Sequence, residues 1–225
     1  MEEEIKPYMD DWIDAGQTYP NELHLKAYAA GINGAIFPAE YGGTPPENYD
    51  AFHELILWDE LARIGGGAVL GQLGIDSMAL PPILLAGSQY LKDKVARDVI
   101  TGRKHISLAI SEPSAGSDVA NIKTTAVLDE SGQFYTVNGS KKWITGGNMA
   151  DFFTVACRTG DEDSGMTGIS LLLLEKGMPG IRVRKMKTQF DSTHGTTFIN
   201  LEDVKVPVRN LIGQEGEMLV DRLLS

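Results

Sequence analysis

The sequence HISLAISE, residues 105–112, marks the point where the chain changes from helical to extended periodicity. After it, short runs rich in β-branched and aromatic residues alternate with Gly, Asp, Asn and Pro, a pattern typical of strands joined by turns. The seven expected strands are HISLAISE, NIKTTAVLD, FYTVNG, FFTVACR, GISLLLLE, GIRVRKM and TTFINLEDVKVP. Because no long helix separates these runs, we expect an antiparallel barrel or sandwich.

The residues before this point are expected to be helical. Apolar residues recur at helical spacing in 3–15 and 21–32. In 48–67, they lie on more than one face, so we expect that helix to be largely buried between others. A further helix is expected to begin at a Ser88 cap and end at Gly102.

The fold class is therefore α+β, with a helical domain followed by a β domain. We expect an N-terminal α-helical domain at 1–103 and a middle β-barrel domain at 104–212. After Pro207 the pattern turns back toward helix, and residues 213–225 are expected to be the start of a C-terminal helical domain that is cut short.

The composition excludes several classes of protein. A formal net charge of −11 would repel nucleic acid phosphates. No apolar run approaches the ~18 residues of a membrane span. The acidic start MEEEIKPYMDDWID shows no signal peptide, so a cytoplasmic or organelle-matrix protein is expected. A single cysteine excludes an internal disulfide framework, and four scattered histidines indicate no metal site.

Four features that resemble functional motifs have simpler interpretations. RIGGGAVLG (63–71) lacks the third glycine of a dinucleotide fingerprint and indicates a flexible helix end. DEDSG (161–165) lacks the rest of a calcium loop and is expected at a hairpin tip, and NGS (138–140) is expected in a hairpin turn. Cys157 lies in an apolar run and is expected to be a small buried hydrophobe.

Two polar, glycine-rich stretches carry the chemistry: LAISEPSAGSD (108–118) and KKWITGG (141–147). In the first, an apolar strand gives way to small residues whose turn leaves backbone N–H groups and hydroxyls free for a flat, polar-edged ring. In the second, Trp143 and Thr145 are two residues apart, so on a strand both would point to one face. An ordinary hairpin with a half-buried Trp is the alternative for this stretch alone.

The two stretches together closely resemble the acyl-CoA dehydrogenase family. FPAEYGG (37–43) upstream and FINLEDVKVPVRNLIGQEG (198–216) downstream extend the resemblance in the same order along the chain. The resemblance covers nearly the whole chain and implies FAD as the cofactor. It also implies a homo-oligomer in the full-length protein.

The resemblance further implies which residues contact FAD. Trp143 would pack against the flavin, and the Thr145 hydroxyl would reach toward its N5 atom. The Ser111 hydroxyl would meet the pyrimidine edge, and Ser117 would also contact the pantetheine arm of the substrate. The full set is Leu108, Ala109, Ile110, Ser111, Glu112, Pro113, Ser114, Ala115, Gly116, Ser117, Trp143, Ile144 and Thr145.

By the same resemblance, the reaction is oxidation of an acyl-CoA to trans-2-enoyl-CoA, with electrons passed to an acceptor such as an electron-transfer flavoprotein. The family's catalytic base is a Glu of the C-terminal helical domain, so we expect no catalytic residue in this chain and no activity from it alone. Glu112 is expected to have a structural role at the end of a strand. Asp191 and His194 are expected in a solvated loop rather than as a catalytic pair.

Two alternatives remain at this point. One is a relative on the same fold that passes electrons to oxygen or oxidises another carbon acid. The other is a non-catalytic protein that binds acyl-CoA or a partner.

Overall fold

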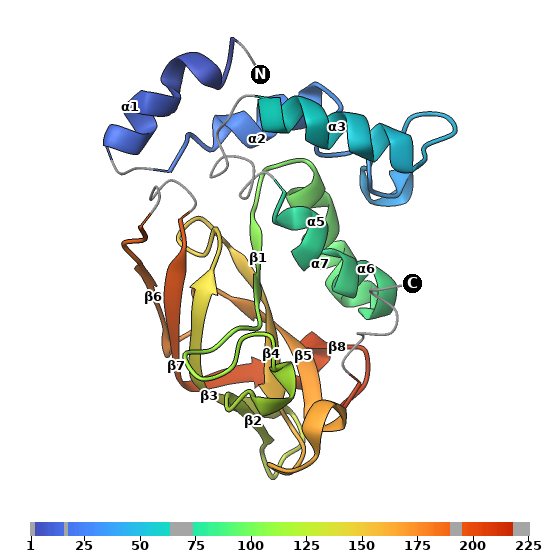
Figure 1. Ribbon diagram of the computed structural model, residues 1–225. Coiled ribbons are helices and arrows are strands. Elements are labelled where there is room, and N and C mark those ends of the chain that lie inside the picture. Colours follow the sequence, from blue (N-terminus) through green and yellow to red (C-terminus); the bar gives the residue numbers. More distant parts are fainter. Residues whose placement is uncertain (1–2, 16–17, 64–73, 190–194, 218–225) are drawn as a thin grey trace.

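The computed structural model describes residues 3–15, 18–63, 74–189 and 195–217. Helices form one half of the molecule and a sheet the other, with β1 running from the helices into the sheet (Figure 1). The elements of the helical half are η1 (Lys6–Tyr8), α1 (Met9–Asp14), α2 (Glu22–Ala29), η2 (Ala39–Tyr41), α3 (Ala51–Arg63), α5 (Asp76–Ala79), α6 (Pro81–Ala86) and α7 (Gln89–Ile100). Short 3-10 helices also lie between strands: η3 (Val119–Asn121), η4 (Gly165–Gly168) and η5 (Val208–Asn210). The strands are β1 (Ile106–Ala109), β2 (Thr125–Leu128), β3 (Phe134–Ile144), β4 (Phe152–Arg158), β5 (Ile169–Glu175), β6 (Ile181–Lys185), β7 (Thr197–Pro207) and β8 (Leu211–Ile212). The α+β class is confirmed.

Helix α7 forms as its sequence predicts. The Ser88 hydroxyl accepts a hydrogen bond from the Leu91 N–H at 3.4 Å, which caps the first turn. Its buried residues recur at helical spacing, and Gly102 follows the helix with a φ of +74°, a conformation that favours glycine. The short helices α5 and α6 were not expected from the sequence.

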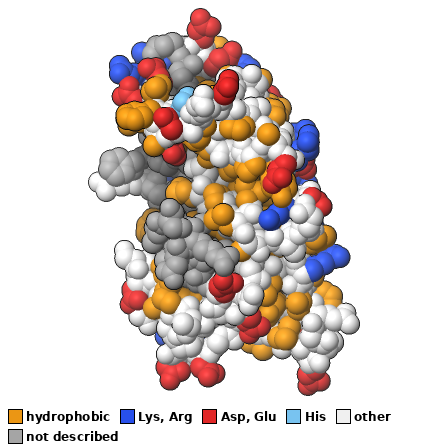
Figure 2. All heavy atoms as spheres, turned by 90° about the vertical axis from the view of Figure 1, so that its right-hand side faces the viewer, with side chains coloured by type: hydrophobic (Ala, Val, Ile, Leu, Met, Phe, Trp, Pro, Cys, Tyr) orange, Lys and Arg blue, Asp and Glu red, His pale blue; other side chains and the backbone are white. Residues whose placement is uncertain are grey.

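Helix α3 corrects one expectation. Its position is as predicted, but the prediction that it is largely buried is wrong: Leu61 is its one buried residue. Phe52, Leu55 and Ile56 are each more than 60% exposed. Apolar side chains lie open on the helical half of the molecule in Figure 2. The reason is that the described part of the chain covers only one face of this helix.

The sheet corrects the expectation of a purely antiparallel barrel. Its eight strands follow the order β6-β7-β3-β2-β4-β5-β8, with β1 beside β4. Most neighbours are antiparallel, but β1 and β2 each pair with β4 in parallel. These two strands are reached through irregular loops rather than tight hairpins, which allows the mixed arrangement.

Two further expectations about the strands are wrong. NGS (138–140) lies inside β3, where the chain bends at a register shift between Val137 and Gly139 instead of turning. After Pro207 the chain forms η5 (Val208–Asn210) and then β8, which pairs with β5, rather than turning at once toward helix. Residues 218–225, and most of the RIGGGAVLG stretch, lie outside the described residues.

The core continues from the helices into the sheet. One cluster joins α6 and α7 to β4 and β5, and a second fills the interior between β3, β4, β5 and β7. All seven residues of β4 are buried, including Cys157, whose role as a buried hydrophobe is confirmed. Burial raises the pKa of its thiol to about 12, which keeps it protonated. DEDSG lies, as expected, in the connection between β4 and β5. Among the described helices, none has both the length and the apolar character needed to cross a membrane.

Candidate functional site

The first predicted stretch leaves the sheet at the end of β1. Leu108 and Ala109 lie beside Thr154 and Val155 of β4, so the strand ends at a fixed place. The following turn is closed by two backbone hydrogen bonds, Glu112 N–H to Ala115 O at 2.8 Å and Ala115 N–H to Glu112 O at 3.3 Å. This turn holds the small residues that follow it at the surface.

A buried ion pair supports the turn from below. Lys141 Nζ donates to Glu112 Oε1 at 2.8 Å and to the Ile110 carbonyl at 2.9 Å. The Glu112 carboxylate also accepts the backbone N–H groups of Lys123 at 2.7 Å and Thr124 at 3.0 Å. Every polar contact of this carboxylate is thus structural, as the sequence predicted for Glu112. Lys141, by contrast, was missed as a supporting residue.

The electrostatics of Glu112 follow from these contacts. Burial alone would raise the pKa of its carboxyl, but the charge of Lys141 and the hydrogen bonds together lower that pKa below its usual value of 4.5. The side chain is therefore an anion at neutral pH and an anchor, and it is poorly suited to take up a proton.

The second stretch, KKWITGG (141–147), contains the end of β3, and its backbone is not that of a regular strand. A register shift lies between Lys142 and Ile144, and Trp143 between them has a φ of +67°. The strand ends at Ile144, before Thr145. The bulge interrupts the alternation of the strand, so the expectation that alternation places Trp143 and Thr145 on one face does not hold.

Trp143 is presented at the surface by this bulge. Its side chain is 54% exposed, and Lys142 Nζ lies 4.5 Å from the centre of its ring. A left-handed backbone at a large aromatic residue costs free energy, and such conformations concentrate at functional sites. The strained turn offers a flat apolar surface that the core does not use.

Hydrogen bonds hold the two stretches side by side. The Lys142 N–H donates to the Ser111 carbonyl at 2.9 Å. The Ser107 hydroxyl on β1 donates to the Thr145 carbonyl at 2.8 Å, a contact between distant segments that no local pattern predicts. Ile144 is fixed from the other side, since its carbonyl accepts the Thr197 hydroxyl at 3.0 Å. Segments far apart in the sequence thus form one surface.

Burial divides the predicted residues into three groups. The buried side chains can offer a ligand only backbone atoms: Ala109, Glu112, Ala115 and Ile144. The half-buried ones lie at the rim: Leu108, Ile110, Ser111 and Thr145. The exposed ones are Pro113, Ser114, Gly116, Ser117 and Trp143. Asp191 and His194 lie outside the described residues.

Two family models match the chain. The model described as "Acyl-CoA dehydrogenase, N-terminal domain" matches residues 1–103, and "Acyl-CoA dehydrogenase, middle domain" matches residues 107–204. Together they include both stretches described above.

Individual proteins agree with these models. The acyl-CoA dehydrogenase apdG of Emericella nidulans is 45% identical over 78% of this chain and 40% of its own length. A probable acyl-CoA dehydrogenase of Mycobacterium abscessus superposes with a TM-score of 0.89 at 36% identity, over 99% of this chain and 58% of the other. An acyl-CoA dehydrogenase of Bacillus anthracis, solved in complex with FAD, has a TM-score of 0.81 at 30% identity, over 95% of this chain and 36% of the other. The chain spans about half the length of the curated relatives it matches.

Proposed function

The chain belongs to the acyl-CoA dehydrogenase family, and on this premise we propose that it provides the flavin-binding surface of an FAD-dependent acyl-CoA dehydrogenase. The reaction proposed is α,β-dehydrogenation of an acyl-CoA thioester to the trans-2-enoyl-CoA. One observation carries the proposal: hydrogen bonds from Lys142 and Ser107 join the two stretches around the exposed ring of Trp143.

The described residues fit a flavin on structural grounds. Trp143 offers an apolar face to a planar ring, and half-buried hydroxyls at Ser111 and Thr145 lie on the two joined stretches. Gly116 has no heavy atom within 4 Å of the place where a Cβ would lie, so the loop leaves open space there. One large flat surface with a few polar groups at its rim is what a planar cofactor requires.

Each residue has a proposed role in holding the cofactor and substrate. Trp143 packs against the flavin, and the hydroxyls of Ser111 and Thr145 donate hydrogen bonds to its polar edges. Donors at such an edge stabilise negative charge that gathers there. Bound FAD would supply the acceptor for the hydride that leaves the substrate's β carbon. Ser117, exposed at the end of the loop, contacts the pantetheine arm.

We propose that removal of the substrate's α proton requires a base from the C-terminal helical domain of the family. Glu112 is buried and its carboxylate is held by Lys141 and two backbone N–H groups, so it is poorly placed to take a proton from a substrate. We therefore propose that the 225-residue chain alone binds FAD weakly and has no dehydrogenase turnover. In the whole protein, electrons would pass to an acceptor such as an electron-transfer flavoprotein.

Replacing Trp143 tests the flavin surface. In the chain extended with a family-type C-terminal domain, Trp143→Ala should weaken FAD retention by up to ~3 kcal/mol, because the ring loses its packing surface. The measurement is flavin absorbance per protein after gel filtration, together with the rate of flavin bleaching by acyl-CoA.

The matched control is Phe134→Ala, which removes another exposed aromatic from the far end of the same strand. That variant should retain FAD like the unmodified protein. If Trp143→Ala also retains FAD and bleaches at the normal rate, the proposed flavin surface is wrong.

A further inference from the structure

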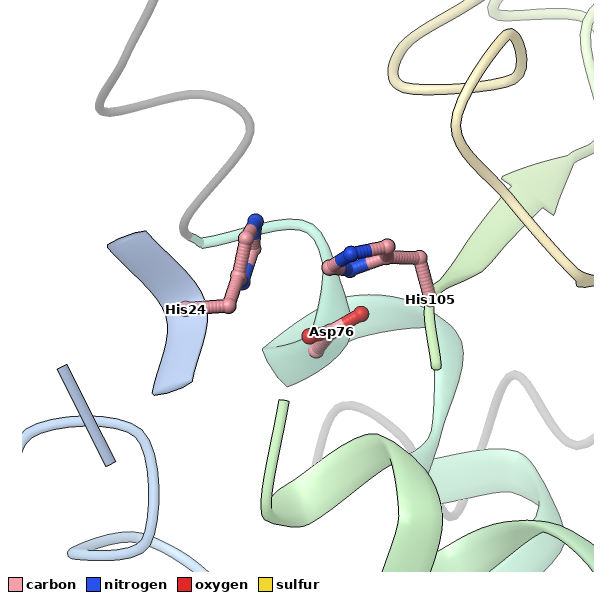
Figure 3. Close-up of side chains that lie close together, drawn as sticks. All are labelled: His24, Asp76 and His105. Carbon is pink, nitrogen blue, oxygen red and sulfur yellow. The ribbon is translucent and has the colours of Figure 1, made fainter. Parts of the chain in front are cut away.

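Three potential metal ligands gather where α2, α5 and the start of β1 meet, although the sequence indicated only scattered histidines. His24 of α2, Asp76 of α5 and His105 just before β1 each offer one ligand atom, and these atoms all lie within 4.8 Å of one another. In Figure 3 the Asp76 carboxylate lies below the two imidazole rings, whose centres are 4.1 Å apart. All three side chains are buried, with exposures of 0%, 5% and 7%.

The two histidines are oriented by contacts through one ring nitrogen each. The Tyr19 hydroxyl and His24 Nε2 form a buried hydrogen bond of 2.7 Å, and His105 Nε2 contacts the Asn21 side-chain oxygen. Metal-binding histidines commonly use one nitrogen in this way, which fixes the ring and leaves the other nitrogen for the ion.

The remaining atoms of the cluster lack matching partners. His24 Nδ1 is buried and has no hydrogen-bond partner among the described residues. The hydrogen bond that Asp76 accepts from the Ile106 N–H is long, at 3.4 Å, and no salt bridge to Asp76 is found in the described part of the chain. A buried carboxyl group without a charged partner and a buried nitrogen without a hydrogen bond are both costly, so their proximity calls for a shared partner.

We propose that His24, Asp76 and His105 form a binding site for a divalent transition-metal ion such as Zn²⁺. Two imidazole nitrogens and one carboxylate oxygen are a ligand set that Zn²⁺ accepts, with a water in the fourth position. Tetrahedral ligands at ~2.0–2.2 Å from the ion stand roughly 3.3–3.6 Å apart, so atoms that lie within 4.8 Å of one another need to close by about 1.5 Å at most. The ion would tie α2 and α5 to the start of β1.

The competing arrangement is a neutral cluster without an ion. In that arrangement His24 Nδ1 stays buried without a hydrogen-bond partner, and Asp76 keeps only the long hydrogen bond from the Ile106 N–H. A Zn²⁺ titration distinguishes the two arrangements.

The experiment is titration of ZnCl₂ into the chelator-treated 225-residue chain, followed by calorimetry and by metal analysis after dialysis. We expect one Zn²⁺ per chain, and His24→Gln should lower the affinity at least about tenfold. The matched control is His53→Gln, because His53 is an exposed histidine on α3, outside the cluster. Its affinity should equal that of the unmodified chain.

A second measurement keeps the test decisive if His24→Gln does not fold. Co²⁺ added to the unmodified chain should give the intense visible absorption of a four-coordinate site without thiolate charge-transfer bands, because Cys157 is not part of the cluster. Absence of stoichiometric Zn²⁺ binding, absence of these bands, or equal affinity in a folded His24→Gln variant would each overturn the proposal. None of these readouts depends on FAD.

Discussion

Strand β4 and helix α3 are both rich in apolar residues, yet they meet opposite environments. All seven residues of FFTVACR in β4 are buried. In α3, AFHELILWDELAR, Leu61 alone is buried, and apolar side chains are exposed on the helical half (Figure 2). The strand is enclosed by its own sheet and by α6 and α7, whereas the described residues cover one face of the helix.

This difference teaches that apolar periodicity shows which residues seek burial but does not show what covers them. A strand such as β4 finds partners in neighbouring segments of the same chain, since β1, β2 and β5 all pair with it. The sheet together with α6 and α7 is therefore a self-contained region, and it can carry the strained surface around Trp143. An exposed apolar face as large as that of α3 is typical of a surface that contacts another body.

Removing one partner of the buried ion pair should give the largest effect within the self-contained region. Glu112→Ala leaves the Lys141 ammonium, which is 0% exposed, without its carboxylate, and should lower the free energy of unfolding by ~3–5 kcal/mol. Denaturant unfolding followed by circular dichroism measures this change. The control is Glu202→Ala, which breaks the exposed pair with Arg182 and should leave the unfolding midpoint unchanged.

The same residue predicts a dependence on pH. Because the pKa of Glu112 is lower in the folded protein than its usual value of 4.5, its contribution is present above that value and is lost as pH falls through the folded pKa. The free energy of unfolding should fall on acidification below about pH 4.5, and the fall should be shallower in Glu112→Gln. A Glu112→Gln variant with the unmodified pH profile would show that this carboxylate is not held by Lys141.

Two matched leucines test the comparison directly. Leu172 of β5 is fully buried and packs in the sheet interior, so Leu172→Ala should cost ~2–5 kcal/mol of unfolding free energy. Leu55 of α3 is 61% exposed, so the same substitution there should stay within about 0.5 kcal/mol. Thermal and urea unfolding of both variants supply the numbers. Equal losses of unfolding free energy would mean that α3 is covered in solution, so that its apolar residues would not differ in burial from those of the sheet.

Much of the fold followed from local patterns. The strands after His105 and the capped helix α7 were predicted because periodicity and caps are local properties of the sequence. The parallel pairing of β1 and β2 with β4 depends on contacts between distant segments, and no local pattern specifies it. The exposure of α3 escaped prediction for the same reason.

The candidate site was predictable in its residues but less so in its geometry. Small residues and an isolated Trp marked the two stretches, whereas the bulge at Trp143 appears only when β3 is aligned with β7. Lys141 lies next to another lysine and reads as surface, yet it is fully buried. The cluster of His24, Asp76 and His105 joins three elements distant in sequence, so spacing rules for metal ligands could not detect it.

The smallest expected effect concerns the backbone strain at Trp143. It tests whether the left-handed conformation that presents the ring lowers the free energy of unfolding. Trp143→Ala and Trp143→Gly both remove the ring and its contact with Lys142, but only glycine adopts a φ of +67° without a steric penalty. The free energy of unfolding of Trp143→Gly should therefore exceed that of Trp143→Ala by ~1 kcal/mol, and Trp143→Gly should unfold at a higher denaturant concentration. The comparison is made by urea unfolding without FAD, so that stability is separated from cofactor binding. If alanine were the more stable of the two, the backbone at this position would not be left-handed in solution, and the bulge would not be what presents the ring.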